Sequence, residues 1–387
     1  MMRLLYCAID QTVPGTKGGS VHVEAVARGL AALGHEVTVL TGPGDRPFPG
    51  GNVTWIPMRP PLGVKELRWM RTGAVTRLAH ALRPDVVIER YYNFGGEGIL
   101  AARAVGAAGM LEVNAPVVDH PGSRKAALDR ALLVRPMRRW RERLCAHADV
   151  IVTPSGAILP PGTPRDKVVE AEWGADTDRF HPGATGRLRF ERPAGVLAVF
   201  AGAFRAWHGA VHLVRAVKLL RERGHRDISA VLIGDGPELP RARAEAAHAE
   251  GIVFTGPVPH DEMPAHLGVA DIGAAPFDVA AHAPLSLGFF WSPLKMFEYM
   301  AAGLPVVAPA VDRIPSLVRH DREGLLYSPA GHVPLAEALV ALSDPEKRAR
   351  MGKAARERAV AEYSWSAHCR ILEAALGRAL ARKTART

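Results

Sequence analysis

The sequence has few cysteines, few aromatic residues and no long hydrophobic run. Its three cysteines, Cys7, Cys145 and Cys369, lie far apart, which fits a reducing compartment and argues against a disulfide framework. No CxxC pair or cysteine–histidine cluster is present, which argues against structural zinc. No apolar stretch reaches the roughly 18–20 residues of a membrane span. The N-terminal apolar run has no small-residue cleavage pattern, so we interpret it as a buried strand of a cytoplasmic protein.

Positive charge is in excess, with 49 Lys and Arg against 39 Asp and Glu and a net charge of +10. Such a bias favours acidic partners, which include nucleic acid, anionic lipid and phosphorylated small molecules. Aromatic residues make up only 6% of the chain and do not alternate with basic ones, so we do not expect nucleic-acid binding. The length of 387 residues, 48% of them hydrophobic, predicts two to three folded domains.

Short apolar runs alternate with longer amphipathic stretches in both halves of the chain, which predicts strands connected by helices. The predicted strands are residues 4–9, 37–40, 53–56, 86–88, 110–113, 150–152, 196–201, 230–233, 252–254, 272–275 and 306–308. Strands separated by helices imply right-handed crossovers and parallel pairing. We therefore predict an α/β protein with two doubly wound parallel-sheet domains. Ligand contacts are expected at the carboxyl ends of the strands, in the cleft between the domains.

A polar stretch rich in Gly and Pro interrupts this alternation and predicts the domain boundary. The predicted parts are an N-terminal domain (1–175), a linker (176–194), a C-terminal domain (195–362) and a C-terminal helix with a basic tail (363–387). This last helix is expected to pack back on the N-terminal domain.

The most informative stretch is residues 292–307, SPLKMFEYMAAGLPVV. Ser292 predicts a helix N-cap and Pro293 a first helical turn. The start of a helix attracts anions, yet Lys295 places a cation in the first turn, where it is repelled by the helix dipole unless an anion binds there. Glu298, one turn later, can accept hydrogen bonds from sugar hydroxyls. The alternative is a surface Lys–Glu pair.

Here the sequence resembles the family-4 retaining glycosyltransferases of the GT-B fold. EYMAAGLPVVA (298–308) is similar to the second half of the family's donor-binding motif, and the resemblance implies that Glu298 binds the ribose of the donor. The family's first motif glutamate falls on Phe290, so the donor-hexose contact is unassigned. Relatives with an SPLK-type segment form a subgroup of the family. The resemblance implies catalysis without a metal or cofactor, in which Arg205, Lys295 and helix amides stabilise the leaving diphosphate.

Further segments resemble the same family along most of the chain. The resemblance implies that residues 1–175 are the acceptor-side domain and residues 195–362 the nucleotide-sugar-binding domain. GGSVHV (18–23) is similar to the N-terminal Gly-Gly loop, WGADTDRF (173–180) to the interdomain segment, and FAGAFRAWHGAVHLV (200–214) to the diphosphate-binding strand and helix. In that last segment His208 stands where the family has lysine. The resemblance implies donor contacts from His208, Gly234, Asp235, Gly236, Val258, Ser292, Pro293 and Leu294. It implies acceptor or phosphate contacts from Gly18, Gly19, Ser20, Asn114 and His120.

Two other patterns are discounted. Asp176-Thr177-Asp178 forms a DxD string of the kind that holds a metal in another glycosyltransferase fold, but it lies in the predicted interdomain segment. The pair Asp119-His120 has no serine or cysteine elbow beside it and is not interpreted as catalytic. We therefore expect no metal site.

A basic stretch, residues 124–143, carries eight Arg and Lys against two acidic residues. It is interpreted as a solvated helix face, and the alternative is docking to an anionic membrane at the inner membrane face. The predicted function is transfer of a hexose from a nucleotide sugar to a glycan, lipid-linked or small-molecule acceptor, with retention of configuration. The alternatives are a sugar-nucleotide epimerase on the same fold and a catalytically silent sugar-nucleotide-binding protein.

Overall fold

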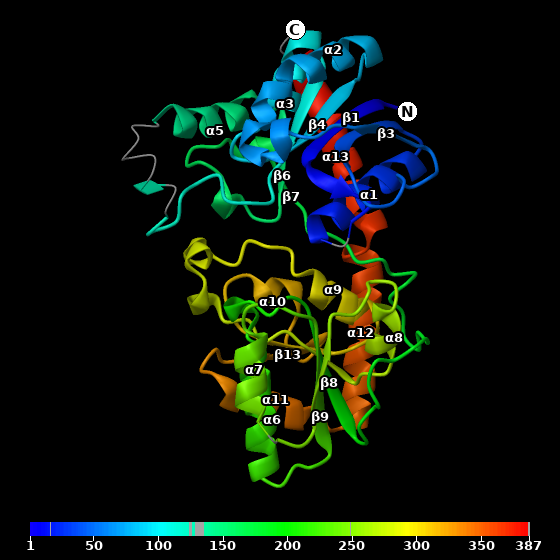
Figure 1. The fold of residues 1–387 in the computed structure, drawn as a ribbon, viewed down its shortest axis with the longest axis vertical. Coiled ribbons are helices and arrows are strands. Elements are labelled where there is room, and N and C mark those ends of the chain that lie inside the picture. Colours follow the sequence, from blue (N-terminus) through cyan, green and yellow to red (C-terminus); the bar gives the residue numbers. More distant parts are fainter. Residues whose placement is uncertain (16, 124–125, 128–134, 248, 386–387) are drawn as a thin grey trace. The chain divides into compact units, whose positions relative to one another are not determined.

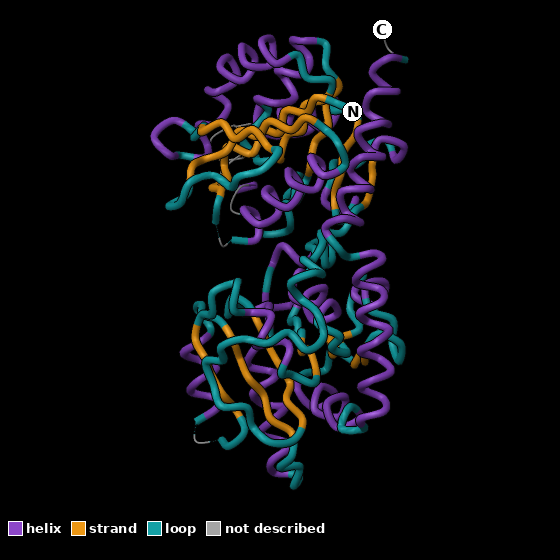
Figure 2. Tube along the Cα trace, turned by 90° about the vertical axis from the view of Figure 1, so that its right-hand side faces the viewer, coloured by secondary structure: helices purple, strands orange, loops and turns teal. Residues whose placement is uncertain are grey.

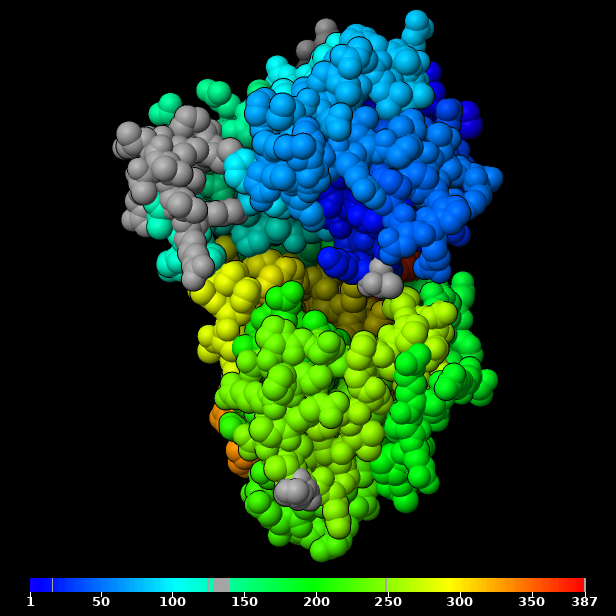
Figure 3. Space-filling model, viewed as in Figure 1, coloured from blue at the N-terminus to red at the C-terminus, as the bar shows by residue number. Residues whose placement is uncertain are grey.

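The computed structural model describes the chain except for residues 16, 124–125, 128–134, 248 and 386–387. It forms two compact units (Figure 1). The first contains Met1–Trp173, Phe290–Ser292 and Trp365–Thr387, and the second contains Gly174–Phe289 and Pro293–Ser364. In the space-filling view, residues coloured blue to cyan form most of the visible surface of the first unit, and residues coloured green to yellow form that of the second (Figure 3).

The first unit is built on a parallel sheet of seven strands in the order β3-β2-β1-β4-β5-β6-β7. The strands are β1 (Arg3–Val13), β2 (Glu36–Pro43), β3 (Val53–Pro57), β4 (Val86–Arg90), β5 (Ala108–Glu112), β6 (Val150–Thr153) and β7 (Val168–Glu170). The helices are α1 (Gly18–Ala32), α2 (Thr72–Leu82), α3 (Glu97–Val105), α5 (Arg135–His147) and α13 (Trp365–Thr384).

Alternate residues of β1 face the two sides of this sheet, as the two-residue period of a strand requires. Leu4 and Tyr6 pack with α1 and α13 on one side, whereas Leu5 and Cys7 pack with α2 and α3 on the other. The sheet therefore lies between two helical layers, with the strands in orange and the helices in purple (Figure 2). Burial on both faces explains why these strands are continuous apolar runs in the sequence.

The second unit repeats this design with a six-stranded parallel sheet in the order β10-β9-β8-β11-β12-β13. The strands are β8 (Val196–Ala201), β9 (Ile228–Ile233), β10 (Ile252–Gly256), β11 (Ile272–Ala274), β12 (Val306–Pro309) and β13 (Gly324–Tyr327). The helices are α6 (Ala210–Glu222), α7 (Leu239–Ala246), α8 (Met263–Gly268), α9 (Leu294–Ala301), α10 (Ile314–Leu317), α11 (His332–Ala341) and α12 (Pro345–Glu362). None of the helices in the described part of the chain is long and apolar enough to cross a bilayer.

The predicted fold class is confirmed, and every apolar run predicted as a strand overlaps a strand. The edge strands β7 and β13, of three and four residues, were not predicted. Residues 176–194, predicted as a linker, form turns and loops and are grouped with the second unit. Helix α13 buries Leu372 and Leu376 in the core of the first unit.

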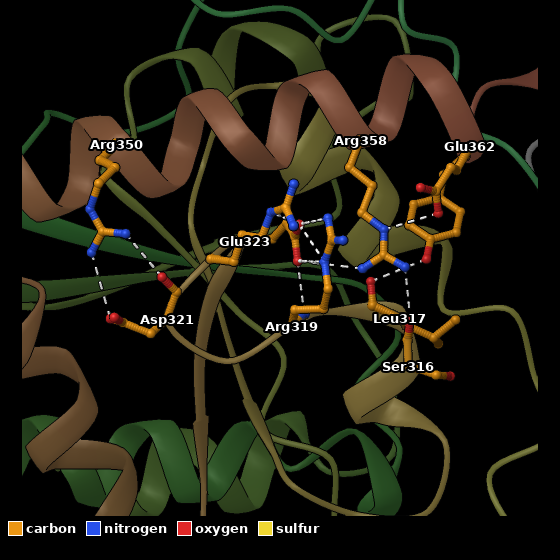
Figure 4. Close-up of polar contacts among 10 residues, drawn as sticks. Ser316, Leu317, Arg319, Asp321, Glu323, Arg350, Arg358 and Glu362 are labelled. Carbon is orange, nitrogen blue, oxygen red and sulfur yellow. Dashed lines mark hydrogen bonds and ion pairs between the residues drawn. The ribbon is translucent and has the colours of Figure 1, made fainter.

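An arginine-rich cluster connects α12 to the segment before β13 (Figure 4). The buried carboxylate of Glu323 accepts hydrogen bonds from Arg319 at 2.9 Å and from Arg358 of α12 at 3.4 Å. Arg358 also donates to the carbonyl of Ser316 at 2.8 Å, and Arg350 lies 3.6 Å from Asp321. Part of the basic excess of the sequence therefore stabilises the second unit itself.

Helix α9 packs against β11 at a point where only glycine fits. A methyl group on Gly273 would lie 2.5 Å from the ring of Tyr299 in α9. The hydroxyl of Tyr299 accepts a hydrogen bond from the backbone N–H of Ala201, the last residue of β8, at 2.7 Å. This contact fixes α9 relative to the carboxyl end of β8.

We expect Gly273→Ala to lower the free energy of unfolding by about 1–3 kcal/mol, because the added methyl group must displace Tyr299. Chemical denaturation of the two proteins measures the difference. Gly377→Ala in α13 is the matched control, since a methyl group added there would have no neighbour within 4 Å, and it should be neutral or stabilising. Equal stability of the two variants would contradict the packing described for α9.

Candidate donor-binding site

The predicted helix start is present, but Ser292 does not cap it. Helix α9 begins at Leu294 with Pro293 at the N-cap position. The hydroxyl of Ser292 donates to Glu172 at 2.8 Å and accepts from the backbone N–H of Trp173 at 3.0 Å, so it is occupied within the first unit. The prediction of an N-cap serine is therefore wrong, because two partners about 120 positions earlier in the sequence occupy its hydroxyl.

Lys295 in the first turn of α9 has a buried ammonium group, and within the described part of the chain this group has no hydrogen-bond partner. Its Nζ lies 4.2 Å from the ring centroid of Phe200 and 5.5 Å from that of Phe277. Burial lowers the pKa of Lys295 to about 7, and the carboxylate of Glu298 opposes this effect. The alternative of a surface Lys–Glu pair is thus wrong. A buried cation that contacts two aromatic rings and no anion within the second unit is suited to bind an anionic ligand.

The turn after β8 leaves room for this ammonium group. Gly202 has a φ of 146°, and a methyl group there would lie 3.0 Å from Lys295 Nζ and 3.6 Å from His208 Nδ1. Gly234 at the end of β9 lies so close to this turn that a methyl group on it would clash with the carbonyl oxygen of Gly202. Any other residue at these two positions would be strained, and at Gly202 its side chain would also fill the space beside Lys295.

The remaining predicted donor residues of the second unit lie on the loops that follow β8, β9 and β10. Arg205 is exposed and precedes the short 3-10 helix η5 (Ala206–His208). Asp235 accepts from the N–H of Gly236 at 2.7 Å and its carbonyl accepts from Phe204 at 2.9 Å, which joins the β9 loop to the β8 loop. Val258 follows β10. Because the carboxyl ends of parallel strands share one edge of the sheet, these loops lie at the same edge as Lys295.

His208 is buried and next to Lys295. Desolvation, and then the nearby charge of Lys295, hold the pKa of His208 well below its ordinary value. His208 is therefore neutral and contributes a polar ring but no charge. The cationic group at this position of the site is Lys295, which reaches it from α9.

One residue that the sequence did not indicate lies beside Glu298. His260, on the loop after β10, places its Nε2 3.5 Å from Glu298 Oε1. Its Nδ1 lies 3.5 Å from the guanidinium group of Arg179, which also donates to the carbonyl of His260 at 3.2 Å. A guanidinium group can only donate, so Nδ1 accepts and Nε2 carries the hydrogen that faces Glu298. The sequence feature that could have indicated His260 is its position two residues after Val258, a predicted donor contact.

In the first unit Asn114 is held by a buried polar network. Its amide donates to Glu112 and accepts from Trp173 Nε1 at 2.9 Å. Glu112 also accepts from the hydroxyl of Tyr6 at 2.6 Å and lies 2.5 Å from His22 Nε2. The second amide hydrogen of Asn114 is the group with which it could contact a ligand.

The other predicted acceptor-side residues lie in two separate places of the first unit. Gly18, Gly19 and Ser20 form the start of α1, and Gly19 is so close to Gln11 that a methyl group on it would clash with the Gln11 side-chain oxygen. His120 is in the loop after β5, where its Nδ1 donates to the carbonyl of Pro121 at 2.8 Å.

The two discounted pairs have structural partners. Asp176 accepts from the backbone N–H groups of Asp178 at 3.2 Å and Arg179 at 3.1 Å, so its carboxylate stabilises a turn. Asp119 pairs with Arg141 at 3.3 Å. Within the described residues, no group of three or more His, Cys, Asp or Glu side chains is arranged to hold a metal ion.

Two further predicted features concern Phe290 and the basic stretch. Phe290 is buried and its ring lies 4.5 Å from that of Trp291, so no acidic side chain replaces the family's first glutamate at this position. Residues 124–125 and 128–134 of the basic stretch lie outside the described residues. In the described part, Arg141 is buried and pairs with Asp119, so it does not contribute to a solvated surface.

Solved structures confirm the fold class. Sucrose-phosphate synthase from Thermosynechococcus elongatus superimposes with a TM-score of 0.69 at 19% identity, over 97% of this chain and 98% of that one. HepE of Anabaena, in a complex with UDP and glucose, gives a TM-score of 0.68 at 16% identity, over 97% and 100% of the two chains. The two parallel-sheet units are therefore those of the GT-B fold.

The family follows from sequence comparison. A family model described as "Glycosyltransferase Family 4" matches residues 16–159, and one described as "Glycosyl transferases group 1" matches residues 195–344. The chain belongs to these glycosyltransferases, as its resemblance to family 4 predicted.

The curated relatives include enzymes named for inositol-containing acceptors. A GDP-mannose-dependent alpha-(1-6)-phosphatidylinositol monomannoside mannosyltransferase of Mycobacterium tuberculosis is 32% identical over 206 residues, which span 50% of this chain and about half (51%) of that protein. A D-inositol 3-phosphate glycosyltransferase of Acidothermus cellulolyticus is 29% identical and covers 88% of this chain and 81% of that protein.

We expect Lys295→Met to raise the free energy of unfolding at about pH 6 by about 1–3 kcal/mol, because it removes a buried charge without a partner. The pKa of Lys295 is about 7 in the folded protein and about 10.4 in an unfolded chain. The unfolded chain therefore binds more protons between these values, and wild-type stability should rise with pH across this window. Denaturation at about pH 6 and about pH 9 measures both effects.

The control for this variant is Lys353→Met, which replaces an exposed lysine of α12 and should leave the pH dependence of stability unchanged. If Lys295→Met destabilises the protein and keeps the pH dependence of the wild type, Lys295 supports the fold and is not a binding residue.

Proposed function

We propose that the protein transfers a hexose from a nucleoside diphosphate sugar to an acceptor hydroxyl, with retention of anomeric configuration. The observation that carries the proposal is the buried ammonium group of Lys295, which has no hydrogen-bond partner in the first turn of α9. A diphosphate is the ligand that satisfies both the lysine and the free N–H groups of a helix start. The names of the relatives, which specify GDP-mannose in one case, support a donor of this class.

The mechanism that we propose depends on stabilising the negative charge that develops on the leaving diphosphate. When the bond between the sugar and the diphosphate breaks, negative charge grows on the diphosphate oxygen. Lys295, Arg205 and the first N–H groups of α9 stabilise this charge, and their positions are fixed before the reaction. The diphosphate oxygen then accepts the proton of the attacking acceptor hydroxyl, so no enzymic nucleophile is required. Neutral His208 orients the diphosphate without adding charge.

Glu298 is proposed to accept hydrogen bonds from the donor ribose. It lies one helical turn after Lys295, so the diphosphate and the ribose would bind along the same side of α9. The Nε2–H group of His260 faces the Glu298 carboxylate, and Arg179 fixes the orientation of the His260 ring. His260 is therefore a positioning residue, which limits the freedom of the Glu298 side chain before the donor binds.

Glu298→Gln should raise KM for the donor about tenfold or more, because the ribose loses an ionised acceptor. His260→Ala should raise KM for the donor by a smaller factor and leave kcat nearly unchanged. His260→Gln should restore most of the donor affinity, because a glutamine amide can donate from the position of Nε2. Steady-state kinetics with varied donor concentration measures all three.

His181→Ala, which removes an exposed histidine of the same unit, is the control for these variants and should match the wild type. A loss of kcat alone in His260→Ala, or no rescue by glutamine, would show that His260 does not act through Glu298.

Transfer is expected to continue in EDTA, because fixed cationic side chains and helix N–H groups supply the positive charge that a metal would supply. Product formation is measured in the presence of EDTA and again after addition of Mn²⁺ or Mg²⁺. Loss of activity in EDTA with recovery on adding either metal would overturn the proposed mechanism.

A further inference from the structure

Exposed apolar side chains are concentrated in one short segment of the first unit. Among the described residues, four of the nine exposed large hydrophobic side chains lie between residues 62 and 70. They are Leu62, Val64, Trp69 and Met70, with exposed fractions of 92%, 41%, 54% and 55%. The others, such as Val360 and Ile371, are scattered over other elements. Single exposed hydrophobic residues are ordinary, but a group within nine residues calls for an explanation.

The segment is anchored by a buried charge network. Arg68 lies in the 3-10 helix η2 (Lys65–Arg71) and is fully buried. Its guanidinium group donates to Asp10 of β1 at 2.7 Å and to Glu97 of α3 at 2.8 Å. Because Arg68 points inward, its neighbours Trp69 and Met70 are held on the outside of a rigid element. Their exposure is thus part of the folded structure.

The backbone conformation of this segment also indicates that its apolar side chains are exposed in the folded structure. Leu62, in the 3-10 helix η1 (Pro61–Gly63), has a φ of 54° and a ψ of 15°, a left-handed conformation that is unfavourable for a non-glycine residue. This strain presents the leucine side chain to solvent and does not bury it. Strain without burial is typical of a segment that is ordered for binding.

Basic side chains surround these apolar groups. Arg59 and Lys65 are exposed, and Arg71 is partly exposed. The acidic residue of the segment, Glu66, accepts a hydrogen bond from Tyr92 at 3.1 Å. The segment therefore combines tryptophan, methionine and leucine with a local excess of positive charge. This combination is typical of protein surfaces that lie in the interface of an anionic bilayer.

We propose that residues 59–71, here called the 59–71 surface, dock on an anionic lipid bilayer. A bilayer fits this combination of exposed apolar and basic side chains, because the apolar groups can enter the lipid interface while the basic groups bind the anionic headgroups. Trp69, Met70 and Leu62 would enter the boundary between headgroups and acyl chains, while Arg59, Lys65 and Arg71 would contact lipid phosphates. The surface is anchored through Asp10 in the carboxyl-terminal part of β1, the edge of a parallel sheet where ligands bind. An acceptor at a membrane could therefore be reached by the same unit.

The test is co-sedimentation of the full-length protein with vesicles of phosphatidylcholine and phosphatidylglycerol, compared with phosphatidylcholine alone. Binding should occur with the anionic vesicles at about 50 mM salt and should weaken at about 300 mM salt, as screening increases. Replacing Trp69 and Met70 together by serine should lower the partition coefficient about tenfold or more, because both side chains lose their burial in lipid. Lys65→Glu should weaken binding mainly at the lower salt concentration.

Matched controls are Val360→Ser combined with Ile371→Ser, and Lys353→Glu, which change exposed residues on α12 and α13 and should leave binding unchanged. The proposal is overturned if the wild type does not sediment, if the Trp69/Met70 variant binds like the wild type, or if that variant instead abolishes a dimer seen by light scattering. No donor or acceptor is present in this experiment. Its failure would therefore leave the proposed transferase function untouched, and loss of transfer would leave vesicle binding untouched.

Discussion

The second unit is organised around an ammonium group that has no hydrogen-bond partner among the residues that the structure describes. The ammonium group of Lys295 is buried near the rings of Phe200 and Phe277 at the start of α9, where the helix dipole also opposes a positive charge. Burial and the dipole therefore both disfavour the charged state, and burial lowers the pKa of Lys295 to about 7. A protein retains such a residue at a cost in stability, and binding of a diphosphate would remove the cost.

The neighbouring elements hold the Lys295 ammonium group in position and leave space beside it. Tyr299, one turn further along α9, packs on Gly273 and accepts a hydrogen bond from Ala201. This contact holds the helix at the carboxyl end of β8. The glycine turn at Gly202 leaves open the volume beside the ammonium group. Neutral His208 borders the same space without adding a second charge, which would lower the pKa of Lys295 further.

The sequence was sufficient to predict the fold because both sheets are buried on two faces, so their strands are continuous apolar runs. It also identified Lys295, since the positive end of the helix dipole repels a cation in the first helical turn. It did not predict the partners of Ser292 or the position of His260 beside Glu298. These contacts join residues more than thirty positions apart, and no local pattern encodes them. Only the structure shows that the rings of Phe200 and Phe277 contact a cation.

The most direct test of the central claim is proton uptake on donor binding. The nucleoside diphosphate is first chosen by thermal shift among UDP, GDP, ADP and TDP. Calorimetry at about pH 8, in buffers of different ionisation enthalpy, then measures the protons taken up; most Lys295 groups are neutral there, so wild-type binding should take up close to one proton. Lys295→Arg should bind without this uptake, because arginine is always charged. Equal uptake by the two proteins, or none by the wild type, would contradict the assignment of Lys295 to the donor diphosphate.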